Sequence, residues 1–92
     1  MSEKIMTLHP DSEKQGVNID RKKYDQVREA ILAEIDARGE VAFSDLPPAV
    51  ERRLPSFEGS VSWYTVSVKL DLEARQLIER VPGKKPQHLR RK

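Results

Sequence analysis

Basic side chains gather near the C-terminus, and their chemistry suits contact with phosphates. Residues 75–92 hold seven Lys or Arg residues and one acid, Glu79, so this segment carries 7 − 1 = +6 charges. Residues 1–74 hold ten basic and fourteen acidic residues, so they carry 10 − 14 = −4 charges. This uneven distribution predicts a basic surface that meets an anionic partner. The alternative, a solvated basic tail without a partner, stays open.

Residues suited to covalent or metal chemistry are sparse. His9 and His88 are the only histidines and lie near opposite ends of the chain, and there is no cysteine. A nucleophile needs a base beside it, and a zinc site needs several His or Cys ligands. The turn at residues 82–85 carries charge but lacks the spacing of a phosphate-binding loop. We therefore expect no enzyme activity, no catalytic residue, no metal site, no cofactor and no small-molecule site.

A helix predicted from Ser60 onward carries two apolar faces. Ser60 is typical of an N-cap, and apolar residues then recur three and four positions apart. The first face consists of Val61, Tyr64, Thr65, Val68 and Leu72, and the second of Trp63, Val66, Leu70, Ala74 and Leu77. A helix of this kind normally packs on both sides. The second face could be core, could be covered by an N-terminal arm, or could be an interface formed by Trp63, Val66 and Leu70.

Caps, periodicity and turn residues place the other elements. Asp20 as N-cap and Gly39 as the helix-ending glycine bound a helix over residues 21–38. Its core stripe is Tyr24, Val27, Ile31 and Ile35. The patterns further predict a strand over 40–43, a helix over 45–54, a strand over 77–81, a turn over 82–86 and a strand over 87–90.

Ninety-two residues suffice for one small domain, which we place at residues 20–92 after an arm over residues 1–19. The arm is apolar at Ile5, Met6, Leu8, Val17 and Ile19, so we expect it to pack on the domain or on a second copy. No stretch approaches the ~20 apolar residues of a membrane helix, and the apolar core of a signal peptide is absent. We expect a cytoplasmic protein without a membrane partner.

The order of these elements resembles the winged helix-turn-helix family over residues 20–91. The most specific segment is Leu-Glu-Ala-Arg-Gln-Leu-Ile-Glu-Arg at 72–80, which is similar to a recognition helix running into the first wing strand. Gln76 stands where such proteins usually have glycine, so it has to adopt the helix-ending conformation. The chain also resembles a small family of uncharacterised bacterial proteins with a Lys-Ile-Met-Thr-Leu-His-Pro start and a Ser-Trp-Tyr…Val-Lys-Leu-Asp-Leu-Glu-Ala-Arg core. That second resemblance implies no activity.

The winged-helix resemblance implies an α+β, mainly α, fold with three helices and a small antiparallel sheet bearing a two-stranded wing. It also implies a DNA-binding protein, such as a transcription regulator. The implied nucleic-acid contacts are Ser60, Ser62, Lys69, Arg80, Lys84, Lys85, Arg90 and Arg91. Base edges are read mainly by Arg, Lys, Asn and Gln, but the implied groove-facing positions carry Ser62, Trp63, Val66, Ser67 and Leu70. Two functions are therefore expected: binding to DNA phosphates, or a protein-interaction or dimerisation module centred on Trp63.

Overall fold

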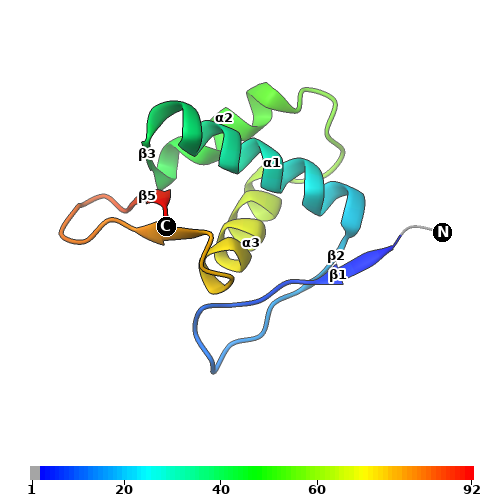
Figure 1. Cartoon of the computed structure of the whole chain (residues 1–92). Coiled ribbons are helices and arrows are strands. Elements are labelled where there is room, and N and C mark those ends of the chain that lie inside the picture. Colours follow the sequence, from blue (N-terminus) through cyan, green and yellow to red (C-terminus); the bar gives the residue numbers. More distant parts are fainter. Residues whose placement is uncertain (1–2) are drawn as a thin grey trace.

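The computed structural model describes residues 3–92, which form an α+β fold of three helices and two small antiparallel sheets. The helices are α1 (Arg21–Arg38), α2 (Leu46–Arg53) and α3 (Val61–Ala74). The strands are β1 (Lys4–Met6), β2 (Asn18–Asp20), β3 (Glu40–Ala42), β4 (Ile78–Arg80) and β5 (His88–Arg91). Figure 1 shows α3 between the β1–β2 hairpin and the other two helices. No helix of residues 3–92 has the length and apolar character to cross a bilayer.

The predicted caps of α1 and α3 are confirmed. The Asp20 carboxylate accepts a hydrogen bond from the Lys23 N–H at 3.2 Å, and the Ser60 hydroxyl accepts one from the Trp63 N–H at 3.2 Å. Each bond satisfies an N–H group that the first helical turn leaves free. Gly39 has a φ of 78°, so α1 ends where the sequence predicts. A 3-10 turn at Phe43–Asp45 makes α2 begin one residue later than predicted.

Gln76 follows the end of α3 and adopts the helix-ending backbone conformation that the winged-helix resemblance predicts. Its φ is 63°, which is unusual for a residue with a side chain. The Leu77 N–H donates to the Leu72 carbonyl at 3.0 Å, so one of the last carbonyls of the helix is satisfied. The chain then turns directly into β4.

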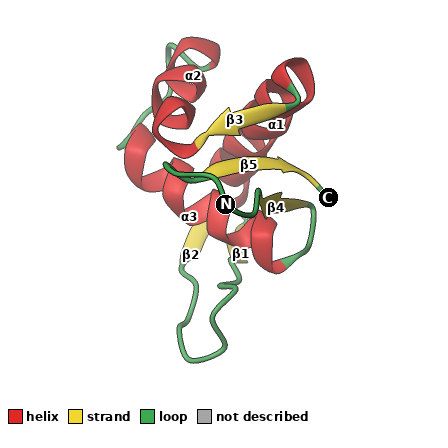
Figure 2. Ribbon diagram, turned by 90° about the vertical axis from the view of Figure 1, so that its left-hand side faces the viewer, coloured by secondary structure: helices red, strands yellow, loops and turns green. Residues whose placement is uncertain are grey.

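The core lies where the three helices meet the three-stranded sheet (Figure 2). The predicted stripe of α1 is confirmed, since Tyr24, Val27, Ile31 and Ile35 are all buried. The inward face of α3 is also confirmed, because Thr65, Val68 and Leu72 are fully buried. The remaining core side chains come from α2, the strands and the arm: Ile19, Val41, Leu46, Val50, Ile78 and Leu89.

The larger sheet has the strand order β3-β5-β4, with β5 pairing antiparallel to both neighbours. Val41 lies opposite Leu89, and both side chains are buried on the face that covers the helices. Glu79 lies opposite Arg90, which brings unlike charges together on the other side. The observed β5 begins one residue later than the predicted strand.

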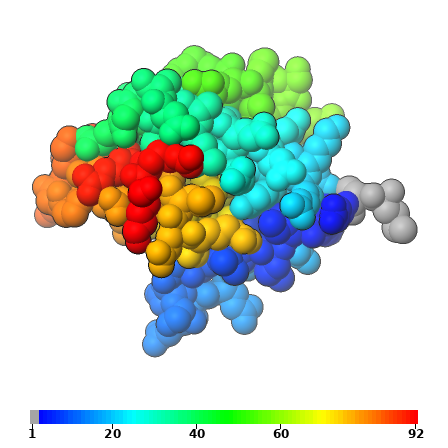
Figure 3. All heavy atoms as spheres, in the orientation of Figure 1, coloured from blue at the N-terminus to red at the C-terminus, as the bar shows by residue number. Residues whose placement is uncertain are grey.

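The arm forms the β1–β2 hairpin and packs on its own domain. Ile5 lies opposite Ile19, and Ile19 is buried in the core. The intervening loop closes because Thr7 and Val17 exchange backbone and hydroxyl hydrogen bonds of 2.8–3.0 Å. A Cβ atom at Gly16 would lie 1.9 Å from the Thr7 carbonyl oxygen, so this closure requires glycine. Figure 3 shows the blue arm against the yellow-to-orange surface at the C-terminal end of α3.

Candidate functional site

The N-terminal half of α3 exposes an uncharged, partly apolar surface, which we call the open face: Ser62, Trp63 and Val66. Trp63 is 46% exposed and Val66 is 38% exposed. Of the charged residues on α3, Lys69 and Asp71 are buried at 3% and 0% exposure. Trp63 is therefore not a core residue, which removes one of the three interpretations of the second apolar face.

Trp63 is held by aromatic neighbours. Its ring contacts Tyr64 edge-on, with 4.9 Å between centroids, and Tyr64 contacts Phe57 in the same way at 5.1 Å. The Lys23 ammonium lies 5.5 Å from the centroid of the Tyr64 ring. Edge-to-face pairs and a nearby cation favour a fixed orientation of such rings. The open face thus presents a large aromatic side chain that packs on one side against Tyr64.

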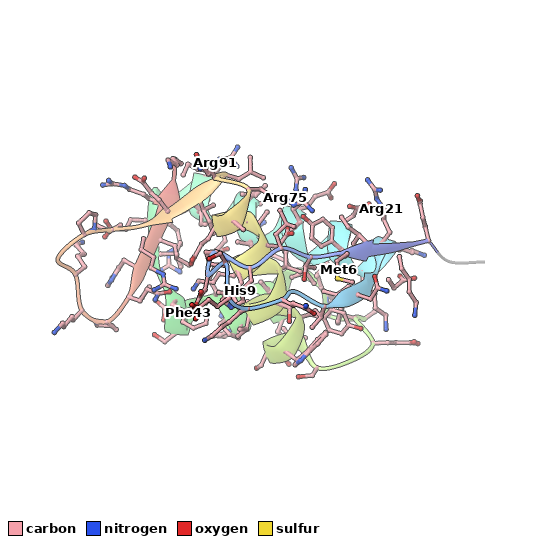
Figure 4. All side chains as sticks on the ribbon, turned by 90° about the horizontal axis from the view of Figure 1, so that it is seen from below. Met6, His9, Arg21, Phe43, Arg75 and Arg91 are labelled. Atoms are coloured by element: carbon pink, nitrogen blue, oxygen red, sulfur yellow. The ribbon has the colours of Figure 1, made fainter. Side chains whose placement is uncertain are left out.

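The arm covers the outer face of α3 beyond Val66. The Leu8 N–H donates to the Asp71 carboxylate at 2.8 Å. A small cavity of about 60 Å³ lies between Leu8 and Val17 of the arm and Ser67 and Leu70 of α3. Figure 4, seen from below, shows the arm passing across the helix. The predicted interface residue Leu70 is therefore shielded by the chain's own arm, whereas Trp63 and Val66 lie outside its cover.

Asp71 joins the arm, α1 and α3 at one buried point. Its carboxylate accepts hydrogen bonds from the Tyr24 hydroxyl and the Leu8 N–H, and both its oxygens lie 2.9 Å from Arg75 Nε. A buried carboxylate needs this number of donors because it has lost its water. The buried role of Asp71 is not among the predictions from the sequence. The available signal was its helical position beside the inward-facing Val68 and Leu72.

Tyr24 should make the stability of the fold sensitive to alkaline pH. Burial, followed by the hydrogen bond and charge of Asp71, raises the pKa of Tyr24 from 10.0 to about 12. The unfolded chain then releases this proton at a lower pH than the folded one. The contribution is therefore complete below pH 10 and is lost as the pH rises toward 12, by about 2–3 kcal/mol. Urea unfolding of wild type and Tyr24→Phe across this range should show a difference that shrinks with pH. A constant difference would contradict the assignment.

The basic residues of the small sheet are engaged with acids of the same chain. Arg80 lies 3.4 Å from Glu73, Arg90 lies 2.7 Å from Glu79, and Arg91 lies 3.2 Å from Asp36. Lys84 pairs with Glu40, and this contact holds the pKa of Glu40 below its ordinary value. Lys85 has no ion pair within residues 3–92, and it lies in the connection between β4 and β5.

The α3 residues predicted to contact nucleic acid differ in their exposure and in their contacts. Lys69 is buried, with Nζ 2.6 Å from a Glu73 carboxylate oxygen and 4.7 Å from the centroid of the Phe43 ring. Burial lowers the pKa of Lys69 despite the attraction of Glu73. The Ser60 hydroxyl is engaged as the cap of α3, while Ser62 is exposed beside Trp63. The basic groups of α3 and of the small sheet therefore do not form one free cationic surface.

Comparison with known proteins places the chain in a family. A model of a protein family of unknown function, DUF6958, matches residues 4–89. The matched region runs from β1 through all three helices and β4, and it ends within β5. No curated protein and no solved structure matches the chain.

Proposed function

We propose that this chain, which belongs to the family of unknown function DUF6958, is a protein-interaction module. It docks on its partner through the open face of α3. The observation that carries this proposal is the 46% exposure of Trp63 on a face without charge. Exposed apolar surface costs free energy in water, and clustered apolar side chains on a soluble domain commonly mark an interface. Tryptophan is also among the residues that contribute most to association when a partner buries it.

We place this module on a winged-helix scaffold. The order α1, β3, α2, α3, β4, β5 and the central position of β5 in its sheet support this arrangement. The β4–β5 connection would then be the wing, and α3 would be the helix offered to a partner. Its open face carries Trp63 and Val66 in place of the side chains that read base edges. The arm also crosses the second half of the helix, which favours a protein partner over the major groove of DNA.

Site-specific photo-crosslinking in cells tests this proposal. Val66 would be replaced by p-benzoylphenylalanine, which leaves Trp63 in place and reacts only with groups that touch the open face. The matched control places the same residue at Ser44, which is exposed in the 3-10 turn before α2. We expect protease-sensitive adducts of defined mass from position 66, lost when Trp63 is also replaced by serine, and none from position 44. Equal adducts from both positions, or none from either, would contradict the proposal.

Nucleic-acid binding through the β4–β5 connection is the second candidate function. Lys84 and Lys85 adjoin there, and Lys84 is half exposed even in its pair with Glu40. Exposed ion pairs contribute only about 0–1 kcal/mol, so phosphates could replace these carboxylates at little cost. Such contacts would be independent of sequence, because phosphate contacts position a protein without reading bases.

Salt dependence separates the second function from the first. Fluorescence anisotropy with random-sequence duplex DNA should show binding whose affinity, for three phosphate contacts, falls roughly six-fold for each doubling of salt. The double substitution Lys84→Glu and Lys85→Glu should abolish this binding and leave adducts from position 66 unchanged. The matched control is the double substitution Lys4→Glu and Lys14→Glu, which makes the same change of charge on the arm. No binding by wild type at low salt would remove nucleic acid as a partner.

A further inference from the structure

We infer that the partner of the open face is a second copy of this chain, arranged so that α3 of each copy packs against the arm of the other. This inference rests on the proposed function and names its partner. It pairs Trp63 and Val66 of one copy with Met6 and Leu8 of its neighbour, about a twofold axis. Each pair of surfaces then occurs twice in the dimer.

The distribution of exposed apolar side chains supports this pairing. Within residues 3–92, four large hydrophobic residues are exposed: Met6 at 56%, Leu8 at 44%, Trp63 at 46% and Val66 at 38%. Two belong to the arm and two to α3, and these elements are adjacent because Leu8 bonds to Asp71. A twofold contact between the elements would bury all four residues of both copies. Burial of this apolar surface is the main favourable term in association.

The arm divides the exposed surface of α3 into a covered half and an open half, which suits a twofold contact. The arm lies across α3 at Ser67, Leu70 and Ala74, and it leaves the helix open at Trp63 and Val66. The surface therefore has a raised half and a lower half. A twofold axis between the halves places the raised half of each copy over the lower half of the other, as an isologous interface requires. A parallel stack would bring the two raised halves together and leave Trp63 uncovered.

Charge and size fit a second copy. The open face carries no charge, and Asp11 and Glu13 of the arm loop are offset only in part by Lys14. The net charge of +2 gives two copies little reason to repel each other. A dimer interface takes up about a tenth of a small protein's surface, which for 5791 Å² is about 580 Å² for each copy. The two halves together have to supply an area of that order for a stable dimer.

Disulfide trapping between two differently tagged variants tests the arrangement, and the chain has no cysteine of its own to interfere. Leu8→Cys and Val66→Cys would be mixed and oxidised after exchange of subunits. We expect the mixed 8–66 dimer to exceed either homodimer at least ten-fold. Ser44→Cys, mixed with Val66→Cys in the same way, should yield no such excess. Sedimentation of wild type should show a dimer whose dissociation constant rises at least 30-fold in Trp63→Ser.

The outcomes distinguish failure of this inference from failure of the proposed protein-interaction function. A wild-type chain that stays monomeric at millimolar concentration overturns the second-copy partner. Predominant 66–66 dimers would place α3 on α3 and overturn the arrangement. In either case, position-66 adducts with a different protein in cells would leave the interaction module standing. Adducts at twice the 10.6 kDa mass of the chain, together with mixed 8–66 disulfides, support both.

Discussion

Replacing Asp71 with alanine is expected to lower the free energy of unfolding by roughly 3–5 kcal/mol, the loss typical when one partner of a buried ion pair is removed. Asp71 has no exposed surface and receives hydrogen bonds from Tyr24, Leu8 and Arg75. Arg75 regains water because its side chain is 36% exposed, but the buried Tyr24 hydroxyl loses its partner. In a domain of this size, the melting temperature should fall by about 15–30 °C.

Asp36→Ala is the matched control for this change, because Asp36 forms an exposed ion pair with Arg91 and should cost less than about 1 kcal/mol. The gentler variant Asp71→Asn reports on the arm. It keeps one acceptor oxygen but weakens the attachment of Leu8, so trypsin should cleave after Lys14 faster than in wild type. If Asp71→Ala and Asp36→Ala unfold at the same temperature, Asp71 does not join the arm to α3 as described.

Trp63→Ser should leave the fold nearly intact while removing the interaction. Trp63 is half exposed and packs mainly on Tyr64, so we expect the free energy of unfolding to change by no more than about 1 kcal/mol. Loss of an aromatic residue at the centre of an interface costs roughly 2–4 kcal/mol of association. Urea unfolding measures the first quantity, and the yield of adducts from a photo-reactive residue at position 66 measures the second.

Leu72→Ala provides the contrast on the same helix. Leu72 is fully buried on the inward face of α3, so its truncation should cost about 2–5 kcal/mol of stability. If Trp63→Ser destabilised the fold as strongly as Leu72→Ala, Trp63 would be a core residue. The open face would then not be an interaction surface. If it changed neither stability nor adduct yield, the interaction surface would have to lie elsewhere.

Local chemistry made the helices predictable. Asp20, Gly39 and Ser60 are residues whose side chains or backbone freedom satisfy helix ends, and each ends or begins a helix where expected. The inward stripes of α1 and α3 followed from helical periodicity alone. The small sheet was predicted to within a residue or two at each strand end, because strand ends depend on pairing partners that a single segment does not reveal.

Contacts between distant segments were not predictable in the same way. Asp71 meets Tyr24 across 47 positions of sequence, and neither residue carries a local signal of the other. The neutralising pairs of the small sheet likewise depend on distant segments: strand register places Glu79 opposite Arg90, and packing on α1 brings Asp36 to Arg91. The sequence left the second face of α3 with three interpretations. The packing of the arm over Leu70, and not over Trp63, divides that face into a covered half and an open half.

The fluorescence of Trp63 tests the central claim most directly, because it is the only tryptophan in the chain and lies on the open face. Acrylamide quenching and the emission maximum would be recorded from sub-micromolar to millimolar protein. We expect the emission to shift to shorter wavelength and quenching to fall several-fold as the concentration rises, with no such change in Leu8→Glu. Emission typical of a hydrated indole and constant quenching across the whole range would show that no second copy covers Trp63.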